Sequence, residues 1–99
     1  MREVDQTEPL HEQVVVWDRI IGSKHGFEYF VLKYDDTTFF KLVHNGDGRF
    51  ERHEKADANE KRRHTSMCMF GEDLIVVTGG HEKKSAEVYS LREDQWRDI

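Results

Sequence analysis

The sequence predicts an all-β fold built from antiparallel strands. Short runs of β-branched and aromatic residues recur along the chain, and clusters of Asp, Asn and Gly separate them. Proline occurs only at Pro9, so the predicted strands keep their backbone N–H donors. The one long polar stretch, Glu54–Arg63, has no apolar stripe that a helix could bury. These observations favour two four-stranded sheets joined by a polar connection.

The first half of the chain is expected to contain four strands and a short extra one. Its runs combine β-branched and aromatic side chains, which suit a pleated and packed surface. Asn45–Gly48 is expected to form a hairpin turn, because Asn, Asp and Gly tolerate positive φ. The predicted strands are Gln13–Trp17, Ile20–Ile21, Phe27–Tyr34, Thr37–His44 and the extra strand Arg49–His53.

The second half is expected to contain four more strands. Glu54–Arg63 is interpreted as an exposed connection that could contain one helical turn. Beyond it, the apolar run Leu74–Thr78 has the length of a strand that is buried on both faces. The predicted strands are Thr65–Phe70, Leu74–Thr78, Ala86–Leu91 and Gln95–Ile99.

Residues 63–99 resemble one kelch repeat, which is a blade of a β-propeller. The resemblance rests on four markers in order: Arg63-His64 before the first strand, Gly79-Gly80 after the second, Tyr89 in the third and Trp96 near the start of the fourth. The glycines let the backbone turn where a Cβ would clash. Tyr89 and Trp96 are large side chains with one polar group each, and they suit the space between two blades.

The first half resembles a degenerate copy of the same repeat. Tyr34 is matched to Tyr89 and Phe40 to Trp96, at separations of 55 and 56 residues, and Ile20–Ser23 is matched to the diglycine strand. Kelch repeats recur about every 50 residues. The expected organisation is therefore an N-terminal tail (1–11), a degenerate blade (12–53), a polar linker (54–62) and a kelch blade (63–99).

Composition narrows the function further. The net charge is −5, and the basic cluster Lys61-Arg62-Arg63 is short enough to be read as a solvated loop, so no nucleic acid is expected as a partner. Cys68 is the only cysteine, which favours a reducing, cytoplasmic location, and it is expected to be a buried, inert thiol. The N-terminal residues lack an apolar stretch, and no segment is apolar enough to cross a membrane.

No catalytic, cofactor-binding or metal-binding residues are predicted. The six histidines form no pair with metal-ligand spacing, and no serine or cysteine has an activating partner in the sequence. The resemblance implies a non-catalytic protein-binding module, acting as a substrate-recognition or scaffold fragment. The alternative is a fragment or an oligomerising subunit of a kelch-type enzyme.

The resemblance also implies that a protein partner contacts loops between strands. The candidate loops are Ser23–Gly26, Asn45–Gly48 and His81–Ser85, with His81, Glu82, Lys83 and Lys84 as the candidate contact residues. Self-association through exposed blade faces is a further expectation, because propellers usually need at least four blades.

Overall fold

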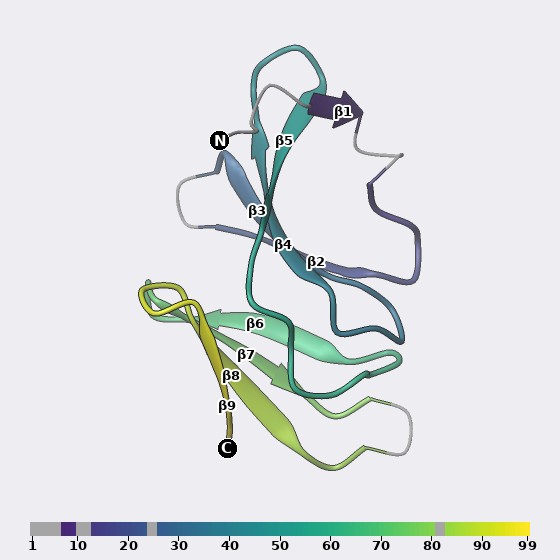
Figure 1. Ribbon diagram of the computed structural model, residues 1–99, viewed down its shortest axis with the longest axis vertical. Helices are drawn as coiled ribbons and strands as arrows, with labels where there is room; N and C mark the ends of the chain where they lie inside the picture. The colour runs from purple at the N-terminus through teal and green to yellow at the C-terminus, as the bar shows by residue number, and fades with distance from the viewer. Residues whose placement is uncertain (1–6, 10–12, 24–25, 81–82) are drawn as a thin grey trace.

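A computed structural model describes residues 7–9, 13–23, 26–80 and 83–99. These residues form nine strands in two antiparallel sheets, and they include no helix (Figure 1). The predicted all-β class is therefore confirmed. Among the described residues there is accordingly no helix that could cross a membrane.

The N-terminal sheet has five strands in the order β1-β5-β4-β3-β2, and the C-terminal sheet has four strands in the order β6-β7-β8-β9. Every pairing joins antiparallel neighbours. The strands are β1 (Thr7–Pro9), β2 (Arg19–Gly22), β3 (Glu28–Leu32), β4 (Phe39–His44), β5 (Arg49–Glu54), β6 (Ser66–Phe70), β7 (Leu74–Thr78), β8 (Ala86–Ser90) and β9 (Gln95–Asp98).

Two predictions about the N-terminal sheet are wrong. Gln13–Trp17 is not a strand, because a turn at Val15–Asp18 interrupts it. The predicted tail contributes Thr7–Pro9 as β1, which pairs with β5. The first four-stranded meander is therefore β2–β5, and the extra strand predicted at Arg49–His53 is its fourth strand.

The two four-stranded meanders repeat with a shorter period than the sequence suggested. β6 begins 47 residues after β2, β7 46 after β3, β8 47 after β4 and β9 46 after β5. In this register Leu42 corresponds to Tyr89 and Phe50 to Trp96. The matches of Tyr34 to Tyr89 and Phe40 to Trp96 are wrong, because they depended on Gln13–Trp17 being the first strand.

Backbone hydrogen bonds show which face of one meander is equivalent to which face of the other. Lys33 N–H donates to the Thr38 carbonyl at 3.1 Å, and Gly79 N–H donates to the Ser85 carbonyl at 3.0 Å. Each bond closes the connection between the second and third strands of its meander. Because pairing alternates along a strand together with the side-chain direction, Val31 and Val77 point to the same face of their own meanders.

The two sheets nevertheless bury opposite faces against each other. Val77 lies in the core between the sheets with Ile75 and Tyr89, whereas Val31 lies in a separate cluster with Phe40 and Leu42. The two sheets are therefore stacked in the same sense: one face of the N-terminal sheet packs against the non-equivalent face of the C-terminal sheet. Equivalent faces are not packed back to back. Figure 1 shows the C-terminal sheet below the N-terminal sheet.

Aromatic side chains dominate the core between the sheets. Phe39 packs against Tyr89 and Trp96 with ring centroids 4.7 and 4.9 Å apart, and it stacks on Phe30 at 5.9 Å. As expected from the sequence, both polar tips are bonded: the Tyr89 hydroxyl donates to Asp94 at 2.6 Å, and Trp96 Nε1 donates to the Ala56 carbonyl at 2.8 Å.

The connection between the sheets is not the exposed loop that was expected, and the helical turn that it could have contained is not formed. It contains no helix, and Ala58 and Arg62 are buried. Ala58 N–H donates to the Thr37 carbonyl of the N-terminal sheet, and Asn59 N–H donates to the Glu87 carboxylate of the C-terminal sheet at 2.7 Å. The connection thus ties both sheets together.

Trp96→Ala should lower the free energy of unfolding by about 3 kcal/mol, because it removes a half-buried ring from the core and leaves the Ala56 carbonyl without its donor. Urea denaturation followed by circular dichroism measures the change. Ile99→Ala is the matched control, since Ile99 is exposed, and its effect should stay within about 0.5 kcal/mol. Equal effects of both variants would contradict the burial of the indole.

Candidate protein-binding surface

A rigid turn presents two apolar side chains to solvent just before β2. Asp18 N–H donates to the Val15 carbonyl at 3.0 Å, which closes a four-residue turn. Val15 N–H donates back to the Asp18 carboxylate at 2.9 Å. At the tip of the turn, Val16 is 85% and Trp17 58% exposed. Two apolar side chains therefore project into solvent from a hydrogen-bonded turn.

Asp18 fixes this turn to the end of β3. Its carboxylate accepts a bond from Tyr34 N–H at 2.8 Å and pairs with the Lys33 ammonium at 2.5 Å. The same ammonium group donates to the Gln13 carbonyl at 3.2 Å. Because the Asp18 side chain is fully buried and paired on both oxygens, the turn is held in one conformation.

Three aromatic rings from separate parts of the chain meet beside the turn. Trp17, Tyr34 and His64 have ring centroids 5.3 to 6.0 Å apart, with both contacts to His64 edge-on. His64 has a φ of +55°, a conformation that side chains other than glycine rarely adopt. We name Val15, Val16, Trp17, Tyr34 and His64 the aromatic turn surface.

A charged pair borders the aromatic turn surface. Arg63 Nη2 lies 3.4 Å from the Asp35 carboxylate, and both side chains are about half exposed. Asp35 N–H donates to the Arg62 carbonyl at 2.9 Å, so the connection between β3 and β4 meets the connection between the two sheets at this point. Residues of these two connections therefore lie together beside the aromatic turn surface.

The three predicted contact loops do not gather in one place. Ser23–Gly26 and Asn45–Gly48 follow β2 and β4, so they lie at one end of the N-terminal sheet, although residues 24 and 25 are outside the described residues. The connection between β7 and β8 corresponds to the opposite end of its own meander. Predicted contact residues His81 and Glu82 are also outside the described residues.

Two of the predicted contact residues, Lys83 and Lys84, are exposed on the connection between β7 and β8. Lys83 pairs with Glu60 at 3.1 Å, and the Ser85 hydroxyl donates to the same carboxylate at 3.0 Å. These bonds lower the pKa of Glu60. Part of this loop is therefore bound to the connection between the sheets.

The diglycine marker has a clear steric reason. Gly80 has a φ of +115°, and a Cβ at this position would lie 3.0 Å from the Arg63 carbonyl oxygen. The backbones of residues 63 and 80 therefore approach each other closely, and a side chain at residue 80 would also meet the Arg62 Cβ at 3.3 Å. Arg63 and His64 thus lie next to Gly79-Gly80 in space.

Arg62 is not part of a solvated basic loop, as the sequence suggested. It is only 2% exposed and pairs with the fully buried Glu87 at 3.1 Å. It also donates to the carbonyls of Gly79 and Ser85 at 2.8 and 2.9 Å. One carboxylate and two backbone carbonyls accept bonds from this guanidinium, which explains why it is retained inside the fold.

Phe40, which the sequence matched to Trp96, lies on the side of the N-terminal sheet that faces away from the C-terminal sheet. It is fully buried in the cluster with Val31 and Leu42, and the Arg52 guanidinium lies 3.7 Å from the centre of its ring.

Burial of Tyr89, with a smaller effect from Asp94, raises the pKa of the Tyr89 hydroxyl well above its usual value. Phe40 and Tyr89 are both structural residues.

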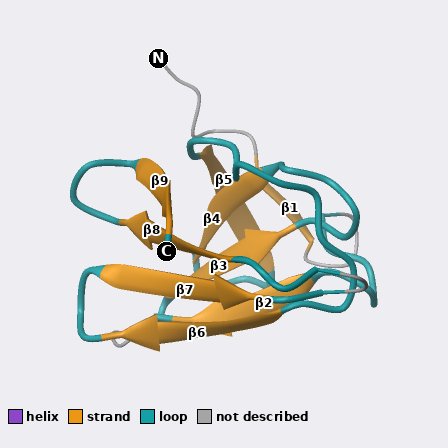
Figure 2. Cartoon of the chain, turned by 90° about the horizontal axis from the view of Figure 1, so that it is seen from below, coloured by secondary structure: helices purple, strands orange, loops and turns teal. Residues whose placement is uncertain are grey.

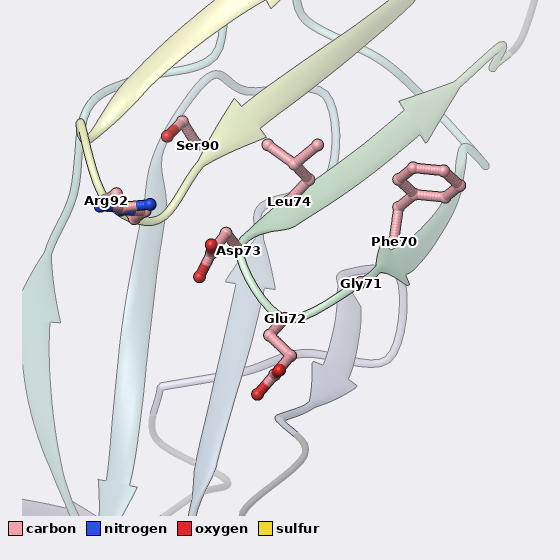
Figure 3. A pocket seen from close by; sticks show the side chains of 7 residues that line it. All are labelled: Phe70, Gly71, Glu72, Asp73, Leu74, Ser90 and Arg92. Carbon is pink, nitrogen blue, oxygen red and sulfur yellow. The ribbon is translucent and has the colours of Figure 1, made fainter.

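A shallow hollow of about 390 Å³ lies between the β6–β7 and β8–β9 turns (Figure 3). Figure 3 shows Arg92 across the opening from the carboxylates of Glu72 and Asp73. The rest of its lining is Phe70, Gly71, Leu74 and Ser90. The hollow is wide open and lacks any convergent set of reactive groups, and no three metal-ligating side chains gather among the described residues.

No family model, curated protein or solved structure matches this chain. The geometry alone must therefore indicate the function. Sequence reasoning missed Val16 and Trp17 as surface residues of a turn, because Gln13–Trp17 was interpreted as a strand. Asp18 is the residue that could have revealed this turn, since Asp side chains often hydrogen-bond to backbone groups within turns.

Proposed function

We propose that this chain is a non-catalytic protein-binding module made of two kelch-type repeats, and that the aromatic turn surface is the centre of its contact with a protein partner. The role would be substrate recognition or scaffolding, and the location would be cytoplasmic. The observation that most supports this contact site is the projecting Val16-Trp17 turn, which a buried aspartate fixes.

The repeat assignment is supported by the arrangement of the two meanders. They share a period of 46 to 47 residues, close to that of kelch repeats, and they stack in the same sense. Tyr89 and Trp96 fill the space between the sheets, as blade-packing residues should. Phe50 of the first meander corresponds to Trp96 and also packs against an aromatic ring, that of Tyr29, with centroids 6.0 Å apart.

The composition of the aromatic turn surface supports protein binding. Trp, Tyr and Arg are the residues that most often dominate binding energy at protein interfaces, and here Trp17, Tyr34 and Arg63 are neighbours. The turn needs little ordering on binding because Asp18 already fixes it, which reduces the entropic cost. An exposed apolar cluster of this kind also marks interaction sites on soluble domains.

The pairing of the buried titratable side chains among the described residues is consistent with the proposed non-catalytic role. The buried titratable side chains are committed to structural pairs: Asp18 to Lys33, Glu87 to Arg62 and Tyr89 to Asp94. None of these pairs lines the hollow at the β6–β7 turn.

Trp17→Ala should weaken binding of the partner at least tenfold while leaving the melting temperature nearly unchanged. The partner would be captured on the immobilised wild-type chain, identified by mass spectrometry, purified and titrated by calorimetry against each variant. Phe27→Ala is the matched control, because Phe27 is similarly exposed at the other end of the N-terminal sheet.

A second variant distinguishes the turn from the predicted loop. Lys83→Ser/Lys84→Ser removes the described charges of the β7–β8 connection. If this variant abolishes binding and Trp17→Ala does not, the contact lies at the loop and the aromatic turn surface is not the binding site.

A further inference from the structure

The edge strand β6 (Ser66–Phe70) lacks the features that protect the other sheet edges. Figure 2 shows β6 outermost in its sheet, with β7, β8 and β9 following in order. Among the described edge strands, β1 contains Pro9, β2 contains Arg19, and β9 contains Arg97 and Asp98. Proline and charged side chains hinder the addition of a further strand. The residues of β6 include neither, so this edge is open to pairing.

The backbone hydrogen bonds around β7 show which of its residues face β6. Gly79 N–H donates to the Ser85 carbonyl at 3.0 Å, and Leu91 N–H donates to the Asp73 carbonyl at 2.8 Å. Residues 73 and 79 flank β7, and both direct these backbone groups toward the side of β8. Because this direction alternates along a strand, the odd-numbered residues of β7 also face β8, whereas its even-numbered residues face β6.

Two residues of β6 therefore have backbone groups that no described strand binds. The even-numbered residues of β7 lie opposite Ser66, Cys68 and Phe70, which face β7 in return. The N–H and carbonyl groups of Met67 and Met69 consequently point away from the sheet. No described strand pairs with β6 on that side, and no other described backbone group bonds to them. The edge thus presents donors and acceptors in a regular row.

The side chains of β6 alternate between solvent and the core. Ser66, Cys68 and Phe70 are exposed, whereas Met67 and Met69 are partly buried against the core between the sheets. The exposure of Cys68 contradicts the buried thiol that the sequence suggested. A strand added beside β6 would continue both rows, so that its own side chains alternate between the outer face of the sheet and the core side.

The start of β6 lies beside the aromatic turn surface. His64, which belongs to that surface, precedes Ser66 by two residues. Trp17 precedes Arg19 by two residues, and the Arg19 Nε donates to the Thr65 carbonyl. The starts of β2 and β6 are therefore held together next to this surface, and one extended segment can reach from β6 onto Trp17 and His64.

We propose that an extended segment of the protein partner adds to β6 as a further antiparallel strand and continues onto the aromatic turn surface. This mode of binding rests on the proposed function, because it specifies the form in which the partner occupies that surface. Antiparallel pairing matches the rest of the sheet and is slightly more stable than parallel pairing. The C-terminal end of the segment then lies beside Ser66 and reaches Trp17 and His64.

The pairing defines what the segment must contain. Its residues opposite Met67 and Met69 each exchange an N–H donor and a carbonyl acceptor with β6, so neither can be proline. Its residue opposite Cys68 lies on the outer face, where a β-branched or aromatic side chain packs best beside the exposed Cys68 and Phe70. The main-chain bonds supply affinity, and the alternate side chains supply selectivity.

A peptide selected on the chain itself provides the probe. A phage-displayed library of random peptides is selected on the immobilised chain, and the tightest peptide is synthesised. In the unbound, isotope-labelled chain, the amides of Met67 and Met69 should exchange with solvent quickly, because no described backbone group binds them. Saturating peptide should slow both rates by about tenfold or more. Asp98 is the matched control, since its N–H points away from edge strand β9 in the same way, and its rate should not change.

Backbone methylation of the peptide tests the pairing independently of the side chains. N-methyl groups on alternate residues, in the frame that binds Met67 and Met69, remove the donors that reach β6 and should weaken binding by about tenfold or more. N-methyl groups in the other frame replace N–H groups that point away from β6, and should change the affinity little. Equal losses in both frames would contradict strand addition.

Trp17→Ala distinguishes strand addition from the proposed function. Both hold if the variant binds the peptide more weakly while the bound peptide still protects Met67 and Met69. Unchanged affinity with full protection would retain pairing at β6 and refute the role of the aromatic turn surface. Weaker binding to the variant, with no protection of the two amides in either chain, would do the reverse, and unchanged affinity without protection would overturn both.

Two further outcomes would overturn strand addition. One is a selection that yields no binding peptide. The other is protection of Met67 and Met69 that rises with the concentration of the chain alone, because a second copy would then occupy the edge.

Discussion

Arg62→Ala should lower the free energy of unfolding by about 3–5 kcal/mol, because it leaves a buried carboxylate without its counter-charge. Arg62 and Glu87 pair at 3.1 Å with both side chains fully buried. The same substitution removes the donors that bind the carbonyls of Gly79 and Ser85. Loss of this side chain therefore affects β8, the diglycine loop and the connection between the sheets together.

Guanidinium chloride denaturation followed by circular dichroism measures this effect. Arg63→Ala is the matched control, since the Arg63–Asp35 pair is half exposed at 3.4 Å and should contribute less than about 1 kcal/mol. Arg62→Met/Glu87→Leu should recover part of the lost stability, because it removes both charges at once. If Arg62→Ala costs no more than Arg63→Ala, the buried pair does not exist as described.

Phe39→Ala should cost about 3–5 kcal/mol, and both sheets should lose stability together. Phe39 belongs to the N-terminal sheet, is fully buried, and contacts Tyr89 and Trp96 of the C-terminal sheet. Removing its ring opens a cavity between the two meanders. The core between the sheets is thus the feature that joins them into one cooperative unit.

Urea titrations with two probes can follow this effect. Trp17 fluorescence reports on the N-terminal part in a Trp96→Phe background, and Trp96 fluorescence reports on the C-terminal sheet in a Trp17→Phe background. Both midpoints should move to lower urea by the same amount when Phe39 is truncated, whereas Phe27→Ala should move neither. A shift of one midpoint alone would mean that the sheets unfold separately.

Local patterns predicted most of the strands. Leu74–Thr78 is β7 with the predicted bounds, because an apolar run ended by two glycines has few alternatives. The hairpin turn at Asn45–Gly48 also formed where Asn and Gly allow it, with positive φ at Gly46 and Gly48. Where a segment's own residues decide its structure, the prediction succeeded.

Segments whose structure depends on distant partners were predicted wrongly. Gln13–Trp17 has strand-like residues, but the Asp18 carboxylate binds Val15, Lys33 and Tyr34 and closes a turn instead. Glu54–Arg63 is polar, yet Arg62 is buried because it pairs with Glu87. This partner lies 25 residues further along the chain. The aromatic turn surface depends on the same long-range contacts, so only its residue types were visible in the sequence.

The stacking of two equivalent meanders in the same sense is the claim on which the repeat interpretation depends. Nuclear Overhauser spectroscopy on the labelled chain tests it most directly, because each face of β4 presents a different phenylalanine. Cross-peaks should connect the Phe39 ring to the rings of Tyr89 and Trp96, while Phe40 should contact only residues of the N-terminal sheet such as Arg52. Cross-peaks from Phe40 or Val31 to β7 or β8 would contradict this stacking.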